Sequence, residues 1–257
     1  MDKPRYSLDG RIALISGASS GLGAHFARLY AAAGAAVVIG ARRVERLDTL
    51  AAEIRAAGGR AHPVAMDVTD EASVIAAFDE AEKAFGVPDV VVCNAGVANG
   101  GRSTTVKMHR VRSVVETNYL GVFITAREGA KRMIEAGFKD TEKGRIILIG
   151  SITAHMTQQG DATYGAIKAG VAHLGRQFAR EWIRLGVNVN TVEPGYVRTE
   201  LDGEWFDTEG GQAQINSWPR RRLTEVGALD DMMLFFASDA SRQVTGTTIA
   251  IDDGQSL

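Results

Sequence analysis

Short apolar segments alternate with longer helical patterns along the chain, and this alternation constrains the fold more than any other feature. The apolar segments are almost continuously hydrophobic, which is typical of strands that are buried on both faces of a sheet. Strands and helices that alternate in this way predict a parallel sheet with helices on both sides. The expected strands are residues 11–16, 35–41, 60–68, 88–96, 144–151, 187–195 and 247–254.

The segments between these strands carry apolar residues at helical spacing. Phe26, Leu29 and Tyr30 fall on one helical face, and Asp70 is expected to cap the N-terminus of another helix. A polar loop with one short helix is expected within 199–222. The other expected helices are residues 24–34, 44–58, 70–86, 104–136, 163–185 and 230–239.

Composition favours one α/β domain over residues 1–257, because the chain has 45% hydrophobic residues and no linker-like segment or repeat. A net charge of -2 argues against nucleic acid or an anionic membrane as the main partner. Cys93 is the single cysteine, so an intrachain disulfide is excluded. The polar start and the lack of an apolar run of about 18 residues predict a cytoplasmic protein without a membrane span. The histidines show no metal-binding spacing, so no metal site is expected.

Ligands of parallel α/β sheets bind beyond the carboxyl ends of the strands, so the residues that end each strand are candidates for a site. The first strand runs into "SGASSGLG", whose glycines permit a tight turn before a helix. The free N–H groups at the start of that helix favour a pyrophosphate. A glycine-rich turn without a ligand is the alternative. The candidate cofactor residues of this segment are Ser16, Gly17, Ser19, Ser20, Gly21, Leu22 and Gly23.

Arg42 and Arg43 follow the second strand, where an acidic residue would hold the ribose 2′-OH of NAD. Two arginines favour the 2′-phosphate of NADP; the alternative is that they begin a solvated helix. Asp67 and Val68 end the third strand and are suited to an adenine edge, although Asp67 is equally suited to capping a turn.

The later strand ends are also built from small, polar or turn-forming residues. Asn94, Ala95 and Gly96 end the fourth strand, and Ser151 ends the fifth. The sixth ends in "EPGYVRT", a turn that is suited to lying against a ring. The candidate cofactor residues of this last turn are Pro194, Gly195, Val197 and Thr199.

Tyr164 lies four residues before Lys168 in "TYGAIKAG", within the expected helix 163–185. Residues at this spacing share a helix face, so both side chains can point into one cleft. A nearby ammonium lowers the pKa of a phenol, which is otherwise roughly 10. Taken alone, a Tyr–Lys pair at this spacing is more often ordinary helix surface.

Together these motifs resemble those of the short-chain dehydrogenase/reductase family. "SGASSGLG" is similar to the family's T-G-x-x-x-G-x-G, with Ser16 in place of Thr. "CNAG" is similar to its N-N-A-G, with Cys93 in place of the first Asn, and "YGAIK" matches its Y-x-x-x-K. The resemblance extends from about residue 9 to residue 254.

Three further features strengthen the resemblance. Ser151 lies 13 residues before Tyr164, as is usual in the family, and "TNYLGVF" resembles the segment that bears its catalytic Asn, here Asn118. "PGYVRT" resembles the motif that cradles the nicotinamide. The resemblance therefore implies that the catalytic residues are Asn118, Ser151, Tyr164 and Lys168. Lys168 is also expected to bind the nicotinamide ribose, and Asn118 to hold a water that links Lys168 to solvent.

The resemblance implies a Rossmann-like, doubly wound domain with seven parallel strands in the order 3-2-1-4-5-6-7. It also implies a homo-oligomer, a dimer or a homotetramer, built mainly through the helices at 104–136 and 163–185. We therefore expect an NADP(H)-dependent oxidoreductase, with NAD(H) less favoured, that acts on a small ketone or secondary alcohol, of the carbonyl reductase or 3-oxoacyl-thioester reductase type. The alternative is an inactive NADP-binding scaffold or sensor.

Three parts of the sequence each have two interpretations. Residues 199–222 resemble the family's mobile substrate lid, and Trp205, Phe206 and Trp218 are suited either to a substrate wall or to packing. The basic clusters at 107–112 and 219–222 suit either a solvated surface or the entrance for an anionic substrate. His155 is expected to be a loop side chain without a catalytic role, with pocket lining as the alternative.

Overall fold

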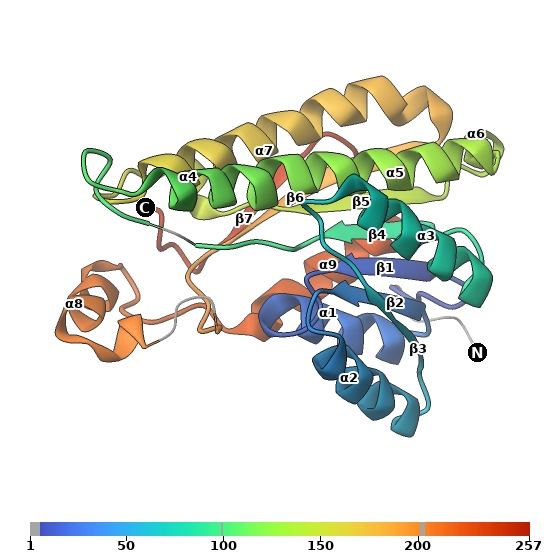
Figure 1. Cartoon of the computed structure of the whole chain (residues 1–257), viewed down its shortest axis with the longest axis horizontal. Coiled ribbons are helices and arrows are strands. Elements are labelled where there is room, and N and C mark those ends of the chain that lie inside the picture. Colours follow the sequence, from blue (N-terminus) through green and yellow to red (C-terminus); the bar gives the residue numbers. More distant parts are fainter. Residues whose placement is uncertain (1–5, 99, 201–203) are drawn as a thin grey trace.

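The computed structural model describes residues 6–98, 100–200 and 204–257. Its sheet has seven strands in the order β3-β2-β1-β4-β5-β6-β7, and every neighbouring pair is parallel (Figure 1). This arrangement confirms the predicted doubly wound fold. The strands are β1 (Ile12–Ser16), β2 (Ala36–Ala41), β3 (Arg60–Ala65), β4 (Val90–Cys93), β5 (Gly144–Ile149), β6 (Val187–Pro194) and β7 (Thr248–Ile251).

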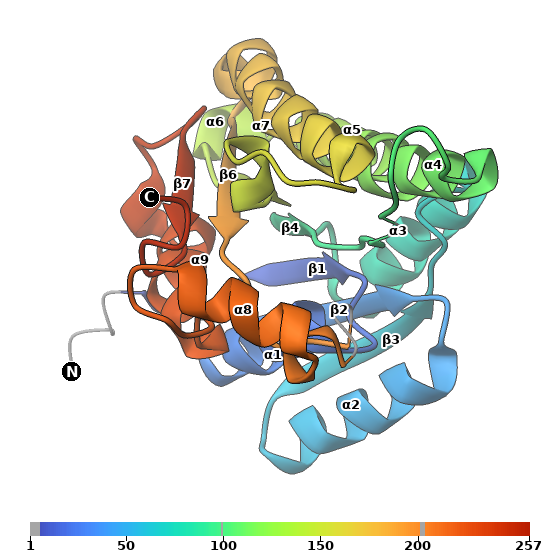
Figure 2. The ribbon, with the colours of Figure 1, turned by 90° about the vertical axis from the view of Figure 1, so that its left-hand side faces the viewer.

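Helices cover both faces of the sheet, as the continuously apolar strands require. One core lies between the sheet and α1, α2 and α9, and a second lies between the sheet and α3, α5 and α7. Figure 2 shows α5 and α7 above the sheet and α1 and α2 below it. The helices are α1 (Gly21–Ala32), α2 (Val44–Ala56), α3 (Glu71–Phe85), α4 (Met108–Val115), α5 (Gly121–Glu135), α6 (Phe138–Thr141), α7 (Ala162–Trp182), α8 (Glu209–Ser217) and α9 (Asp230–Ala237). None of these described helices is both long and apolar enough to cross a membrane.

The expected helix over 104–136 is interrupted rather than continuous. It begins at Met108 and contains a π-helical turn, Glu116–Leu120, between α4 and α5. At this turn Asn118 is fully buried, and both atoms of its amide bond the backbone of Val97. The π-helical turn thus places the Asn118 amide against the segment that follows β4, and such turns are frequent at functional sites.

Local hydrogen bonds set the other element boundaries. Asp70 caps α3 as predicted, because its carboxylate accepts a hydrogen bond from the N–H of Ala72 at 3.0 Å. The third strand ends at Ala65 rather than at residue 68, because Asp67 forms a tight turn in which it accepts the N–H of Thr69 at 3.0 Å.

The expected lid at 199–222 contains a turn at Trp205–Asp207 and helix α8, which stands apart from the layered body in Figure 1; residues 201–203 of this segment lie outside the described residues. Phe206 and Trp218 are buried in a small core, where Trp218 stacks on Tyr196 at 5.2 Å between ring centroids. These two rings are therefore packing residues. Trp205 is 49% exposed.

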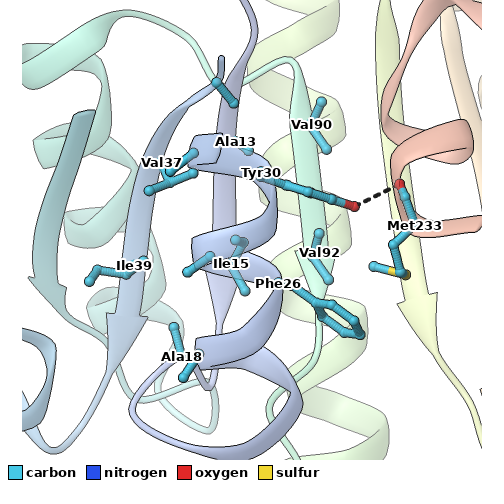
Figure 3. Packing of buried hydrophobic residues seen from close by; sticks show 14 of the residues in the cluster. Ala13, Ile15, Ala18, Phe26, Tyr30, Val37, Ile39, Val90, Val92 and Met233 are labelled. Carbon is cyan, nitrogen blue, oxygen red and sulfur yellow. Dashed lines mark hydrogen bonds between the residues drawn. The ribbon is translucent and has the colours of Figure 1, made fainter. Parts of the chain in front are cut away.

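A buried hydrogen bond joins the first and last helices of one core. Tyr30 of α1 is fully buried, and its hydroxyl donates to the carbonyl oxygen of Met233 in α9 at 3.0 Å (Figure 3). Burial raises the pKa of this phenol, so it stays a neutral donor.

We expect the substitution Tyr30→Phe to lower the free energy of unfolding by about 1–2 kcal/mol, because it removes a fully buried hydrogen bond between α1 and α9. Urea denaturation of both proteins measures the difference. Tyr119→Phe is the matched control, since the Tyr119 hydroxyl forms no hydrogen bond with the described residues. Equal losses in the two variants would contradict this account.

Candidate active site

The carboxyl ends of strands β1 to β6 meet in one cleft of about 1200 Å³. The α7 residues Tyr164 and Lys168 line it from one side, and Trp205 and Gln214 of the lid segment line it from another. Three predicted residues, Ser16, Gly23 and Asn118, lie behind its wall. The other predicted residues line it: Gly17, Ser19, Ser20, Gly21, Leu22, Arg42, Arg43, Asp67, Val68, Asn94, Ala95, Gly96, Ser151, Tyr164, Lys168, Pro194, Gly195, Val197 and Thr199.

The turn between β1 and α1 is packed so closely that only glycine fits at two positions. Gly17 has φ +68°, and a Cβ there would lie 2.7 Å from Cα of Ala95. A Cβ on Gly23 would lie 2.4 Å from the carbonyl oxygen of Gly17. The side chain of Ser20 does not cap α1, so the first N–H groups of the helix face the cleft without that partner. This cradle fits the pyrophosphate of a dinucleotide.

Ser16 and Asn94 hold β1 and β4 together directly behind this cradle. The Ser16 hydroxyl accepts hydrogen bonds from the N–H groups of Asn94 at 3.1 Å and Ala95 at 3.2 Å, and it donates to Val92 at 3.3 Å. The Asn94 amide donates to the carbonyl oxygens of Ser16 at 3.0 Å and Gly17 at 3.2 Å. The hydroxyl that Ser16 shares with Thr is thus the atom that this position needs.

Arg43 bridges the glycine turn and the start of the lid segment. It donates to Ser19 at 3.1 Å, to Ser20 at 2.7 Å and to the Glu200 carboxylate at 3.2 Å. Arg46 also pairs with Glu200, at 2.6 Å. Hydrogen bonds from these two arginines lower the pKa of the Glu200 carboxyl. An acidic group is therefore already held beside these arginines, at the mouth of the cleft.

Asp67 keeps one carboxylate oxygen free of the turn that it forms. Its Oδ1 accepts from both the N–H and the hydroxyl of Thr69, at 3.0 and 2.8 Å. Partial burial would raise its pKa, but the hydrogen bonds from Thr69 and the charge of Arg42 together hold it below the usual range. Asp67 therefore both caps the turn and faces the cleft as an anion.

Tyr164 and Lys168 lie one helical turn apart on α7, with Nζ of Lys168 5.5 Å from the centroid of the Tyr164 ring. Lys168 is only 5% exposed, and its ammonium donates to the carbonyl oxygen of Ile149 at 2.7 Å. Burial lowers the pKa of Lys168 to about 8, against the charge of Glu193, which favours the ammonium. The pair has the contact that the spacing predicted.

Ser151 is oriented by a residue that the sequence did not single out. Its hydroxyl oxygen accepts from the N–H of Thr153 at 3.2 Å and from the Thr153 hydroxyl at 3.0 Å. With the oxygen engaged in this way, the Ser151 proton is available for a group in the cleft.

Asn118 supports the cleft from behind. Its Oδ1 accepts from the N–H of Val97 and its Nδ2 donates to the Val97 carbonyl, both at 2.8 Å. This pairing fixes the segment that follows β4. The amide oxygen and nitrogen each retain one further hydrogen-bonding position, so the expected water-holding role stays a prediction.

Gln255, near the C-terminus, fixes the turn after β6, and no local pattern indicated it. Its Oε1 accepts the N–H of Tyr196 at 2.6 Å, and its Nε2 donates to Arg222 at 3.0 Å. A Cβ on Gly195 would lie 2.6 Å from that Oε1. The Pro194–Gly195 turn is therefore closed by a side chain that lies 59 residues beyond Tyr196 in the chain.

His155 and Glu193 form a second missed contact. His155 is not among the residues that line the cleft; its Nε2 lies 2.7 Å from Oε2 of Glu193. The one available sequence signal was a single acidic residue inside an otherwise uncharged strand. No group of three or more His, Cys, Asp and Glu in the described ranges is arranged to hold a metal.

Comparison with known proteins gives a consistent picture. A model of the short chain dehydrogenase family matches residues 11–210. The cis-4-hydroxycyclohexanecarboxylate dehydrogenase of Sinomonas cyclohexanicum is 38% identical over 250 residues, covering 95% of this chain and 96% of that one. The 3-oxoacyl-(acyl-carrier-protein) reductase of Escherichia coli (strain K12) is 32% identical, covering 96% and 98%. The structure of a gluconate 5-dehydrogenase from Burkholderia cenocepacia J2315, in complex with NADP and tartrate, superposes with a TM-score of 0.91 at 35% identity, covering 98% and 97%.

We expect Ser16→Ala to lower the free energy of unfolding by about 1–3 kcal/mol, because it removes the acceptor of two backbone N–H groups. Ser16→Thr, which keeps the hydroxyl, is the matched control and should lose far less. Chemical denaturation compares the three proteins. An alanine variant as stable as the parent would show that the hydroxyl does not hold β1 to β4.

Proposed function

The chain belongs to the short-chain dehydrogenase family of oxidoreductases, and from that premise we propose that it transfers hydride between NADP(H) and a secondary alcohol or ketone. The observation that carries the proposal is the convergence of Tyr164, Lys168 and Ser151 on the cleft that holds the glycine cradle. An inactive NADP-binding scaffold does not require a buried lysine beside a phenol. We therefore favour an active enzyme over the inactive scaffold.

Lys168 is the residue that suits the phenol of Tyr164 to acid–base work. A pKa of about 8 leaves Lys168 mostly as an ammonium at neutral pH. A positive charge close to a phenol favours the phenolate and brings its pKa down from roughly 10. Tyr164 can then donate its proton to the substrate oxygen in ketone reduction and take it back in alcohol oxidation.

Ser151 complements this proton transfer at the same substrate oxygen. Because Thr153 donates to its oxygen, Ser151 can donate its own proton to the carbonyl and polarise it. A bound nicotinamide supplies or accepts the hydride. The protein contributes the positions of the groups and the charge around them.

The proposed preference for NADP(H) rests on Arg42 and Arg43. Both line the cleft beyond β2, where the 2′ position of an adenosine ribose is expected. Guanidinium groups suit a phosphate there, and the two acids that line this part of the cleft, Asp67 and Glu200, both lie close to an arginine. Because Glu200 already pairs with Arg43, a 2′-phosphate would compete with that carboxylate for the arginine.

The substrate end of the cleft supports a compact polar substrate. The polar residues of the cleft that are not predicted cofactor contacts include Arg102, Arg110, Gln158, Gln159 and Gln214, and Gln214 accepts a hydrogen bond from the exposed ring of Trp205. Amide and guanidinium groups suit hydroxyl and carboxylate groups better than an extended acyl chain. We therefore place hydroxylated or carboxylated cyclic and sugar-like alcohols ahead of 3-oxoacyl thioesters.

Oligomerisation through α5 and α7 is proposed as well. A shallow groove on these helices is lined by the apolar residues Phe123, Ala130, Ile134, Phe178 and Trp182 and by the charged residues Arg127, Lys131, Glu135 and Glu181. Phe178 and Trp182 stack there at 4.1 Å between centroids. A groove on paired helices that combines apolar rings with charges of both signs suits a second copy of the same chain.

The function is tested by following the absorbance of reduced nicotinamide with hydroxy acids, polyols, cyclic alcohols and 3-oxoacyl thioesters. Tyr164→Phe should lower kcat by about 10³-fold or more, because the proton donor is lost. NADPH binding should be retained, as measured by fluorescence titration. A variant that keeps near-parental turnover would overturn the role of Tyr164.

Cofactor choice is tested by Arg42→Ala. Loss of a charged hydrogen bond to the 2′-phosphate should weaken NADPH binding by about 10- to 100-fold and leave NADH almost unchanged. Arg60→Ala is the control, because Arg60 begins β3 and the cleft lies at the other end of that strand. It should change neither the Kd for NADPH nor the Kd for NADH. Equal weakening of both cofactors would contradict a 2′-phosphate contact.

A further inference from the structure

Glu193 is a buried acid to which the proposed chemistry assigns no role. It lies in β6 directly before Pro194, and its side chain is 1% exposed. An ionised carboxylate is costly to bury unless charge or hydrogen bonds compensate it. An acid at this position therefore needs partners, and its surroundings identify them.

Close packing directs the Glu193 side chain toward helix α7. Thr191, two residues earlier in β6, faces α7, since a Cβ on Gly175 of that helix would lie 2.6 Å from its hydroxyl. Alternate residues of a strand share a face, so Glu193 points to the same side. Its Cγ lies over Gly150, directly after β5, where a Cβ would approach it to 2.7 Å. Lys168 of α7 donates at 2.7 Å to the carbonyl oxygen of Ile149, the residue directly before Gly150. Glu193 and the Lys168 ammonium therefore meet at the same point, the end of β5.

The two carboxylate oxygens of Glu193 have different surroundings. Oε2 lies 2.7 Å from Nε2 of His155, whose side chain is 62% exposed. Oε1 is buried and forms no hydrogen bond with the described residues. The charged groups that act on Glu193 are His155, from the segment after β5, and Arg176 and Lys168 of α7. Burial raises the pKa of this carboxyl, and these three groups oppose the rise.

We propose that Glu193 is a positioning residue that stabilises the charged form of Lys168, and that the exposed His155 sets how much negative charge Lys168 experiences. The proposal rests on the proposed function only where it assigns Lys168 to catalysis. The electrostatic link between Glu193 and Lys168 stands without that assignment.

The net charge of the His155–Glu193 pair depends on which form of His155 faces the ionised carboxylate. With an imidazolium, the pair is neutral as a whole. With a neutral imidazole, the pair carries one net negative charge beside Lys168. Negative charge favours an ammonium, so Glu193 supports the charged form of Lys168 most strongly when no positive charge lies on position 155.

Glu193→Gln removes the charge and keeps the shape of the side chain. We expect it to lower the pKa of Lys168 from about 8 by roughly 0.5–1 unit. NMR titration of protein labelled at the lysine side-chain carbons measures this without turnover, and Lys168→Arg assigns the signal. Glu80→Gln, which removes an exposed carboxylate on α3, is the matched control and should leave the titration unchanged.

The pH profile of ketone reduction provides a second readout. Ketone reduction requires the protonated phenol of Tyr164 beside the ammonium of Lys168. When nearby negative charge is removed, this pair loses its first proton at lower pH. In Glu193→Gln the alkaline limb of kcat/KM should therefore move to lower pH by about the same 0.5–1 unit. A merely structural role for Glu193 would lower stability and leave this limb in place.

Two variants of His155 test the proposal even if Glu193→Gln does not fold, because this side chain is exposed. His155→Lys places a permanent positive charge on Glu193, and we expect the Lys168 titration to move to lower pH. His155→Gln leaves Glu193 without a positive partner, and we expect the Lys168 pKa to stay at or above its parental value. A Lys168 pKa that falls in His155→Lys and does not fall in His155→Gln is the signature of an electrostatic link.

The outcomes separate this inference from the proposed function. A shifted Lys168 titration in a protein that turns over none of the substrates would sustain the inference and reject the function. Parental turnover with identical Lys168 titrations in Glu193→Gln, His155→Lys and His155→Gln would sustain the function and overturn the inference. If the alkaline limb of kcat/KM moves as far in Glu80→Gln as in Glu193→Gln, the inference would also be overturned.

Discussion

The pairing of β1 with both β2 and β4 at the centre of the sheet is the constraint on which the site depends. The strand order reverses there, so α1 and α5 leave the sheet on opposite faces and open a cleft between them. Ser16 and Asn94 close the gap between the two strand ends with hydrogen bonds to backbone groups. The glycine turn can then pack closely against the segment that follows β4. The carboxyl ends of β5 and β6 lie at the same edge of the sheet.

Electrostatics in the cleft follows from burial more than from surface charge. Lys168 is buried, with the carbonyl oxygen of Ile149 at its ammonium, and burial makes the charged form costly and lowers its pKa to about 8. A lysine on the surface would keep a higher pKa and would be screened by solvent. The same burial makes Lys168 sensitive to one further buried charge, and Glu193 supplies it. Exposed pairs such as those of Glu200 act instead at the rim of the cleft.

Sequence reasoning predicted the parts that depend on local pattern. Continuous apolar strands, the glycines of "SGASSGLG" and the Asp70 cap depend on a few adjacent residues, and the fold and the cap are confirmed. It did not predict contacts between residues that lie far apart in the sequence. Gln255 meets Tyr196 across 59 residues and His155 meets Glu193 across 38, and no period or spacing encodes such a meeting. The π-helical turn at Asn118 was not predicted for another reason. One inserted residue leaves the helical pattern of apolar residues intact on either side of it.

The contact between Gly150 and Glu193 joins the ends of two neighbouring strands. A Cβ at position 150 would lie 2.7 Å from Cγ of Glu193 and 3.1 Å from the methyl group of Thr191, so both side chains of β6 restrict this position to glycine. The two positions are therefore coupled. A variant with a side chain at position 150 has to displace or shorten the acid at position 193, and it would move the charge near Lys168 without touching either residue of the Tyr164–Lys168 pair.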